Sequence, residues 1–357
     1  MKIKDLCSYA PKSRIKAGEA VENAKYLFFT SSADENKRYT DFQFDKEAII
    51  MGTGGNATLH YYNGKFSVST DCLVLFPNSK IKCKYLYYFF KSHMSVLEAG
   101  FKGAGLKHTN KKYIEEINVS KVPDLSIQEK IVSHLDTITE NIEKLNRELE
   151  LFDSLTKARF VEMFGDYLKD DRRPLSEVAI ITGGLTKNSN RNTFETKMPY
   201  LRVANVFYNR LDLREILKIG VKEEEIEKTL LQAGDLLFVE GNGSIEQIGR
   251  VAIWDGSIDP ILHQNHLIKA RFNNEIIAPE YALFYFMLQD GRQQIISKSV
   301  STSGLNTLSV NKVSSLLLPI PPIALQNQFA NFVRQVDKSR FDIKKSIIEL
   351  EREVVYD

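Results

Sequence analysis

The feature that most constrains this chain is an internal repeat. Short matches recur between its two halves, and they keep the same order: Tyr26-Leu27 with Tyr200-Leu201, Asn63-Gly64 with Asp255-Gly256, Gly105-Leu106 with Gly304-Leu305, and Val122-Pro123 with Ile320-Pro321. The offset between partners rises from 174 at Tyr26 to 199 and 198 at the last two matches, as expected if the second copy had gained loop residues. A repeat of this length means a duplicated domain. We therefore predict two related domains with a pseudo-two-fold relationship.

Both copies end in a heptad pattern. Apolar residues alternate by four and three positions, which is the 3.5-residue repeat of a coiled-coil seam. The seam residues are Ile131, Leu135, Ile138, Ile142, Leu145, Leu149 and Phe152, and then Phe329, Val333, Val336, Ile343, Ile347 and Leu350, with Arg340 as the polar interruption. We expect a first helix over 127–164 with a capping box at Ser126 and Glu129. The two seams are expected to pair as an antiparallel coiled coil. The alternative is two amphipathic helices, each lying on its own domain.

Short runs of strand-forming residues precede each long helix. They lie at 26–30, 47–51, 65–69 and 73–76 in the first copy, and at 178–182, 200–203, 235–240, 251–254 and 267–272 in the second. Each copy then contains one aromatic helix, at 85–99 and 279–297. The predicted fold is α+β, with a strand-rich domain over 1–125, a central long helix in 126–173, a second domain over 174–322 and a C-terminal long helix over 323–357.

Cysteine content and hydropathy bound the class of protein. The three cysteines contain no CxxC pair, which argues against a disulfide framework or a thiolate zinc site. No apolar run is long enough to span a membrane, and the first residues lack the hydrophobic core of a secretory signal. We expect a cytoplasmic protein without a membrane partner. The net charge of +2 neither supports nor excludes nucleic acid as a partner.

Patterns that carry catalysis are missing from the sequence. It contains no GxxxxGK[ST] phosphate loop, no GxGxxG after a strand, and no Asn-Pro-Pro-Tyr-type tetrapeptide of amino-methyltransferases. His263 and His266 have no third metal ligand nearby, and the glutamates from Glu223 to Glu227 indicate a solvated helix face. We expect no catalytic residue, no metal and no cofactor.

Two kinds of loop are candidates for recognition. Glycine lets a backbone approach phosphate closely, while Lys positions phosphate and Asn reads base edges. The candidate residues are Gly54, Asn56, Gly241 and Asn242 in glycine loops; Lys102, Lys107, His108, Asn110, Lys111, Lys298, Ser303 and Asn306 in loops after the aromatic helices; and Lys187, Asn188 and Arg191 in a further polar cluster. Lys107 and Lys298 are predicted to contact phosphate in equivalent loops, and Asn110 and Asn306 to reach bases. Plain hairpin loops are the alternative.

At this point the layout resembles a known family. Ile127-Gln128-Glu129-Lys130-Ile131 and Leu325-Gln326-Asn327-Gln328-Phe329 open the helices, and Leu151-Phe152-Asp153-Ser154-Leu155 precedes the end of the first. These motifs resemble the specificity subunit of type I restriction-modification systems. The resemblance implies two target-recognition domains that each read one half of a bipartite, asymmetric site in double-stranded DNA. The helices would set the spacing and dock the partners.

The same resemblance places the chemistry elsewhere. It implies DNA adenine methyltransferase (modification) subunits and a restriction/translocase subunit as partners, with the specificity subunit itself not an enzyme. Two other functions stay open from the residues alone. One is a nuclease with unrecognised acidic residues, and the other is a scaffold that joins proteins through the coiled coil without reading DNA.

Overall fold

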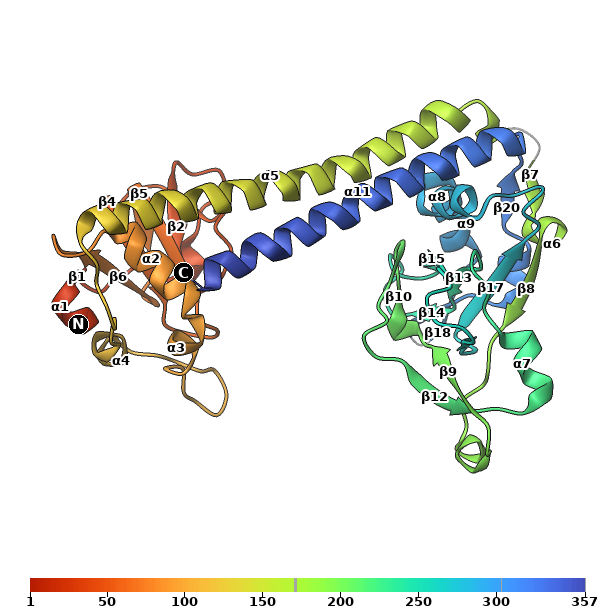
Figure 1. The fold of residues 1–357 in the computed structure, drawn as a ribbon, viewed down its shortest axis with the longest axis horizontal. Coiled ribbons are helices and arrows are strands. Elements are labelled where there is room, and N and C mark those ends of the chain that lie inside the picture. Colours follow the sequence, from red (N-terminus) through yellow and green to blue (C-terminus); the bar gives the residue numbers. More distant parts are fainter. Residues whose placement is uncertain (170–171, 303, 357) are drawn as a thin grey trace. The chain divides into compact units, whose positions relative to one another are not determined.

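A computed structural model describes residues 1–169, 172–302 and 304–356 (Figure 1). The chain divides into two compact units. Unit 1 comprises Met1–Arg147 and Ile343–Asp357, and unit 2 comprises Glu148–Asp342. Two long helices, α5 (Leu125–Phe164) and α11 (Ile323–Tyr356), each contribute residues to both units. Each unit is therefore described with its own part of both helices.

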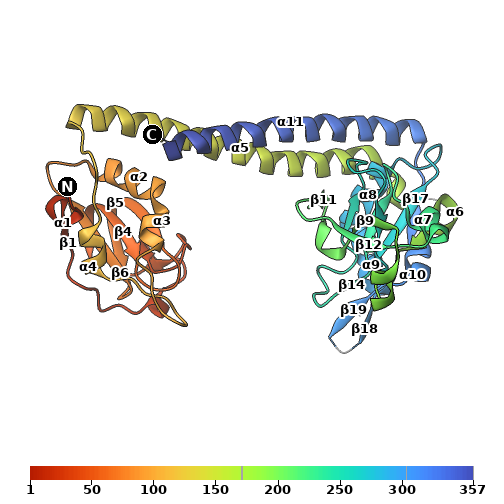
Figure 2. The same ribbon diagram turned by 60° about the horizontal axis from the view of Figure 1, so that its bottom comes forward.

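Unit 1 is built on one six-stranded sheet in the order β1-β6-β4-β5-β2-β3. Its strands are β1 (Cys7–Tyr9), β2 (Tyr26–Phe29), β3 (Arg38–Tyr39), β4 (Phe44–Gly52), β5 (Leu59–Val68) and β6 (Cys72–Pro77). Its helices before α5 are α1 (Ile3–Leu6), η1 (Ala17–Glu19), α2 (Cys83–Ser92), α3 (Met94–Glu98) and α4 (Lys111–Glu116). Figure 2 shows α2 and α3 against the sheet.

Unit 2 contains several smaller sheets. They are ordered β15-β13-β17-β8, β12-β9-β16, β14-β19-β18, β10-β11 and β20-β7. The strands are β7 (Arg172–Pro174), β8 (Ala179–Gly183), β9 (Lys197–Leu201), β10 (Val206–Phe207), β11 (Arg210–Leu211), β12 (Leu217–Gly220), β13 (Leu236–Val239), β14 (Gly241–Asn242), β15 (Val251–Ile253), β16 (Leu262–His263), β17 (Leu267–Phe272), β18 (Val300–Thr302), β19 (Leu305–Thr307) and β20 (Leu317–Pro319). The helices are η2 (Tyr167–Lys169), α6 (Leu175–Val178), η3 (Ser189–Thr193), η4 (Val203–Asn205), α7 (Glu223–Thr229), α8 (Pro279–Met287), α9 (Gln289–Lys298) and α10 (Val310–Ser314).

The two units repeat one topology. The order β1-β6-β4-β5 in unit 1 matches the order β8-β17-β13-β15 in unit 2, with antiparallel pairing throughout both sets. A short helix precedes the first strand of each set. The N–H of its first residue donates to a carbonyl oxygen in the corresponding distant segment of its own unit: Ile3 to Ile117 (3.0 Å) and Leu175 to Leu316 (2.9 Å). The predicted α+β fold with an internal repeat is confirmed.

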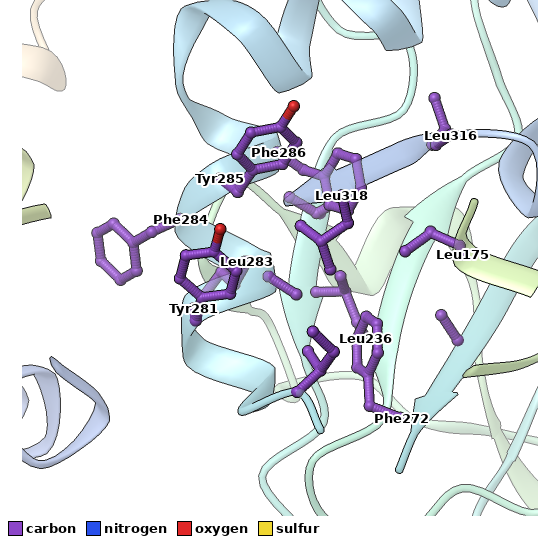
Figure 3. Packing of buried hydrophobic residues seen from close by; sticks show 14 of the residues in the cluster. Leu175, Leu236, Phe272, Tyr281, Leu283, Phe284, Tyr285, Phe286, Leu316 and Leu318 are labelled. Atoms are coloured by element: carbon purple, nitrogen blue, oxygen red, sulfur yellow. The ribbon is translucent and has the colours of Figure 1, made fainter. Parts of the chain in front are cut away.

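Apolar side chains from the aromatic helix fill the core of each unit. In unit 2, Tyr281, Leu283 and Phe286 pack with Leu236 from the sheet and Leu318 from β20 (Figure 3). All five are almost fully buried. In unit 1, the buried residues include Leu86 and Phe90 of α2 and Ile49 of β4. At ~25 cal/mol per Å² of apolar surface, burial of this kind is the main stabilising term in each unit.

The long helices meet along the predicted seam inside each unit. In unit 1, Leu135 and Ile138 are buried in a cluster that includes Leu350. In unit 2, the ring of Phe160 meets that of Phe329 edge-on at 5.3 Å. The pairing predicted from the heptads is confirmed, and the helices also pack on their own domains, because Tyr88 of α2 donates a hydrogen bond to Asp136 of α5 (2.6 Å).

Arg340, the polar interruption of the seam, lies beside an acidic partner on the opposite helix. Its guanidinium is 2.5 Å from a carboxylate oxygen of Asp153 and lies 5.9 Å from the ring centroid of Phe152. The apolar stem of an arginine covers neighbouring apolar surface while its head group stays hydrated. A charged residue is therefore accommodated in the heptad pattern without a buried, unpaired charge.

Some predicted boundaries were wrong. The first long helix begins at Leu125, before Ser126, and Ile127 and Gln128 donate their N–H groups to the carbonyl oxygen of Asp124. Ser126 is thus inside the first turn and is not the N-cap. Each aromatic helix is also interrupted, at His93 and at Leu288, where backbone outside the helical region divides it into two helices.

Candidate nucleic-acid interface

In unit 1 the glycine loop after β4 lies beside the loop that follows α3. The N–H of Gly55 donates to the carbonyl oxygen of Lys107 (2.9 Å), and the N–H of Thr109 donates to that of Thr53 (3.0 Å). Lys102 and His108 exchange two backbone hydrogen bonds of 2.9 and 3.0 Å, which close the second loop on itself. We call residues 52–56 and 102–110 arm 1.

Close packing in arm 1 requires glycine. A Cβ atom placed on Gly54 would lie 3.2 Å from the imidazole ring of His108, and one placed on Gly52 would lie 2.8 Å from the Cα of Ser31. Gly55 has a φ of +84°, in the left-handed region that favours glycine. Gly54 therefore lets the two loops approach closely, whereas Gly52 makes room for Ser31 and Thr58, which lie outside arm 1.

Unit 2 contains the same construction with more regular pairing. Strand β14 pairs with β19, and β19 pairs with β18 to form a hairpin whose turn contains Gly304, with a φ of +81°. The N–H of Leu308 donates to the carbonyl oxygen of Glu240 (2.7 Å), as Thr109 donates to Thr53 in arm 1. We call the described residues of 241–243 and 300–307 arm 2. Figure 2 shows β18 and β19 at the margin of unit 2.

The structure changes the predicted correspondence between the arms. His108 is the backbone β-bridge partner of Gly54, and Thr307 is the strand-register partner of Gly241. Lys107 therefore corresponds to Asn306 and not to Lys298. Lys298 is the last residue of α9 and lies before the hairpin. Asn110 and Asn306, which were both predicted to reach bases, also occupy different positions in their units. Asn110 caps α4 by accepting from the N–H of Tyr113, and Ser309 caps α10 in the same way.

Most candidate side chains of arm 1 are solvent-exposed. The exposed members are Asn56, Lys102, Lys107, His108 and Asn110. Lys111 follows them at the start of α4, where its ammonium lies 3.6 Å from Glu115 and 4.5 Å from the ring centroid of Tyr9. A surface ion pair of this kind contributes ~0–1 kcal/mol, so it does not prevent a phosphate contact. Arm 1 thus presents several cations and amides on one pair of loops.

Arm 2 presents fewer free groups. The side-chain amide of Asn306 is largely buried and donates to the carbonyl oxygens of Asn242 and Gly243, both at 3.3 Å. Asn306 therefore holds β19 to the glycine loop of arm 2. Its side chain is not free to make the base contact that was predicted for it. Asn242 accepts from the N–H of Ser244 (2.9 Å). Ser303 lies outside the described residues.

Arg191 was predicted as a DNA contact and has a different role. Its side chain is buried, and its nitrogens donate to the carbonyl oxygens of Thr186 and Gly220 and to both carboxylate oxygens of Glu225. This ion pair lowers the pKa of Glu225, chiefly through the hydrogen bond. Arg191 holds η3 against α7, because a buried guanidinium needs such partners. The neighbouring Lys187 and Asn188 are exposed and remain candidates.

With this geometry established, comparison with known proteins identifies the family. Residues 1–151 and 171–352 each match the sequence model of the type I restriction modification DNA specificity domain. The chain belongs to this family. One specificity domain covers arm 1 and the other covers arm 2, so the two arms occupy corresponding parts of two family domains.

Individual relatives agree with this assignment. The chain is 22% identical to the type I restriction enzyme EcoKI specificity subunit of Escherichia coli (strain K12), over 95% of this chain and 73% of that protein. It is 31% identical to the type I restriction enzyme MjaX specificity subunit of Methanocaldococcus jannaschii, over 47% of this chain and only 39% of that protein. A type I restriction-modification S subunit from M. genitalium has the same fold, with a TM-score of 0.63, 18% identity and coverage of 99% of this chain and 93% of that one.

The cysteine thiols and His263 of this chain are buried. Burial raises the pKa of the Cys72 thiol to about 11 and that of the Cys7 thiol to about 12, and it lowers the pKa of His263 to about 4. His263 is held by the carbonyl oxygen of Thr229 (2.8 Å). Within 1–169, 172–302 and 304–356, no group of three or more His, Cys, Asp or Glu side chains forms a metal site. No described helix is long and apolar enough to cross a membrane.

Proposed function

We propose that this chain is the specificity subunit of a type I restriction-modification complex, and that each unit reads one half of a bipartite DNA site through its arm. The observation that carries this proposal is the arm itself. Two domains that differ at most positions both pair a glycine loop with the loop after the aromatic helix. A feature built twice in one family of DNA specificity domains is best explained by a shared ligand.

The polar groups on the arms suit that ligand. Lys102, Lys107 and His108 of arm 1 can position a phosphate backbone, whereas the residues at the corresponding positions of arm 2 are Val300, Asn306 and Thr307. Phosphate contacts set affinity and register, while hydrogen bonds and apolar contacts to base edges set sequence. Because the two arms differ in side-chain chemistry, we expect two different half-sites. Lys187 and Asn188 are proposed as additional contacts of unit 2.

An apolar face on the central helix supports the proposed partners. Leu151, Leu155 and Val161 of α5 are exposed by 66%, 49% and 54%. Leu151 and Leu155 line one apolar hollow with Ala158 and the seam residue Phe152, on the part of α5 that belongs to unit 2. We propose that this face docks a methyltransferase subunit. Methyl transfer and DNA cleavage then reside in partner subunits, and this chain is not an enzyme.

A cytoplasmic location is part of the same proposal. The proposed ligand, duplex DNA, is found there, and the three cysteines are free and buried in the fold. Thiols persist in a reducing compartment. Periplasmic fractionation of an expressing strain would test the location directly, because the proposed complex must be recovered with the cytosol.

The decisive experiment is methylome sequencing of cells that express this chain with its methyltransferase subunit. The proposal expects one bipartite motif with a different sequence in each half. Exchanging residues 174–322 for those of a related specificity subunit should change one half of that motif and leave the other intact. If the methylated sequence were independent of this chain, the scaffold alternative would be favoured. Magnesium-dependent cleavage by the purified chain alone would favour the nuclease alternative.

A further inference from the structure

Each arm carries an exposed leucine at the same structural position. Leu106 lies in the loop closed by Lys102 and His108 and is 70% exposed, and Leu305 follows the turn glycine of the β18–β19 hairpin and is 46% exposed. Both belong to the Gly-Leu pair that recurs between the copies. The correspondence of Lys107 with Asn306 across the arms places the two leucines at equivalent positions.

Packing within the arms does not account for these side chains. Among the described residues, neither leucine belongs to a buried apolar cluster, although Leu305 reaches within 4.0 Å of the Cβ position of Gly241. A leucine side chain that stays exposed does not contribute the ~1.5–3 kcal/mol of stabilising free energy that its full burial would give. A solubilising loop gains nothing from a leucine at its end. The side chain therefore has a use when the arm meets its ligand.

Comparison of the arms suggests what that use is. Their other residues differ, with Lys102 and His108 of arm 1 replaced by Val300 and Thr307 in arm 2, whereas the leucine is the same. Residues that differ can read different half-sites, while a shared residue performs the same task at both. Apolar side chains enter DNA grooves, contact thymine methyl groups and press between base steps. These contacts fit a leucine at the end of a polar arm.

We propose that Leu106 and Leu305 enter the DNA groove at their respective half-sites and contact the bases directly. This inference rests on the proposed DNA-reading function and adds two positioning residues to it. The leucines contribute affinity that depends on an ordered, specific complex. They do not contribute to phosphate binding, so the number of released counterions stays unchanged without them.

Disulfide crosslinking tests the placement of the side chains. Leu106→Cys and Leu305→Cys variants would be mixed, in complex with the methyltransferase subunit, with duplexes that carry the methylated motif and a disulfide-tethered base at successive positions. Val21→Cys and Ile180→Cys, exposed residues outside the arms, are matched controls. The three native cysteines of this chain are buried and should not react, and the complex formed with the parent chain measures the background from the partner's cysteines. We expect crosslinks at bases of one half-site for Leu106→Cys and of the other for Leu305→Cys, and none for the controls.

Binding measurements on the same complexes complete the test. Leu106→Ser and Leu305→Ser should each weaken binding to the motif about tenfold with an unchanged salt slope, whereas Leu106→Met and Leu305→Met should bind like the parent. Tight binding by all variants, without any base crosslink, would overturn the inference and leave DNA reading by the rest of the arms intact. Failure of the parent complex itself to bind the motif would overturn both this inference and the proposed function.

Discussion

Gln128 and Gln326 stand 198 positions apart and make the same three hydrogen bonds in the two units. The amide nitrogen of Gln128 donates to the carbonyl oxygens of Lys80 and Pro123, and its oxygen accepts from the N–H of Lys82; Gln326 uses Ile276, Pro321 and the N–H of Ala278 in the same way. Both side chains are fully buried. Because Lys82 and Ala278 are the N-cap residues of α2 and α8, each glutamine joins a long helix to an aromatic helix.

Removing one of these glutamines should therefore weaken the attachment of a long helix to its domain. Gln326→Ala leaves a buried N–H and two carbonyl oxygens without their partner, and each buried group left unsatisfied costs ~1–3 kcal/mol. We expect a loss of about 3 kcal/mol in the free energy of unfolding, measured by urea denaturation. Gln328→Ala is the control, because Gln328 is exposed on the same helix. Equal stability of the two variants would contradict the structural role.

The seam can be tested with two phenylalanines of α11. Phe329 is fully buried against Phe160 and Phe164, whereas Phe341 is 69% exposed. Phe329→Asp buries an unpaired carboxylate and should destabilise the chain by about 4–5 kcal/mol, while Phe341→Asp should change stability by less than about 0.5 kcal/mol. Thermal melting of both variants measures the difference. Leu145→Asp and Ile343→Asp, at half-buried seam positions, should fall between these values.

A phosphate contact in arm 1 and a buried structural arginine outside the arms should differ in the salt dependence of binding. Lys107→Ala should weaken binding to all duplexes about equally and reduce the slope of log K against log salt by about one, because one phosphate contact is lost. Arg191→Ala should instead lower the melting temperature, since its guanidinium is a buried structural partner of Glu225. Fluorescence anisotropy at several salt concentrations measures the slope. A slope unchanged by Lys107→Ala would remove this residue from the interface.

Acid should destabilise unit 2 through His263. Burial lowers the pKa of His263 to about 4 in the fold, whereas an unfolded histidine titrates near 6.5. The unfolded chain therefore takes up a proton first, so the stability is fully present above pH ~6.5 and declines as the pH falls towards 4. At pH 5 the loss is about 2 kcal/mol. His263→Asn should remove this part of the pH dependence, which is measured by denaturant unfolding between pH 7 and pH 4.

The exposed face of α5 should matter for assembly and not for folding. Leu151→Asp places a charge on a side chain that is already 66% exposed, so melting of the chain alone should be unchanged. Association with the methyltransferase subunit should weaken at least tenfold, because a carboxylate buried in an apolar interface loses its hydration. Analytical ultracentrifugation of mixtures measures this. Parent-like assembly would place the docking surface elsewhere on the helices.

Much of the architecture follows from local patterns in the sequence. The strand at Leu267–Phe272, the heptads around Leu135 and Val333 and the aromatic helices were predictable, because hydrophobic periodicity directly reflects which face of an element is buried. The repeated order of these patterns also indicated the duplicated domain and its family. Boundaries were less predictable, as at Ser126, because a backbone carbonyl of Asp124 replaces the side-chain cap that the motif suggested.

Long-range pairing sets how the candidate residues are used. Local patterns show that glycine loops and polar loops recur, but the pairing of Gly54 with His108 joins segments far apart in the chain, and no local pattern encodes it. The same holds for Arg191, whose basic, polar neighbourhood predicted a surface contact. Its partner Glu225 lies on another helix, and the free energy of burying a charge depends on whether such a partner is brought within reach. Periodicity sets which faces are buried, whereas long-range pairing sets which polar groups remain free to bind.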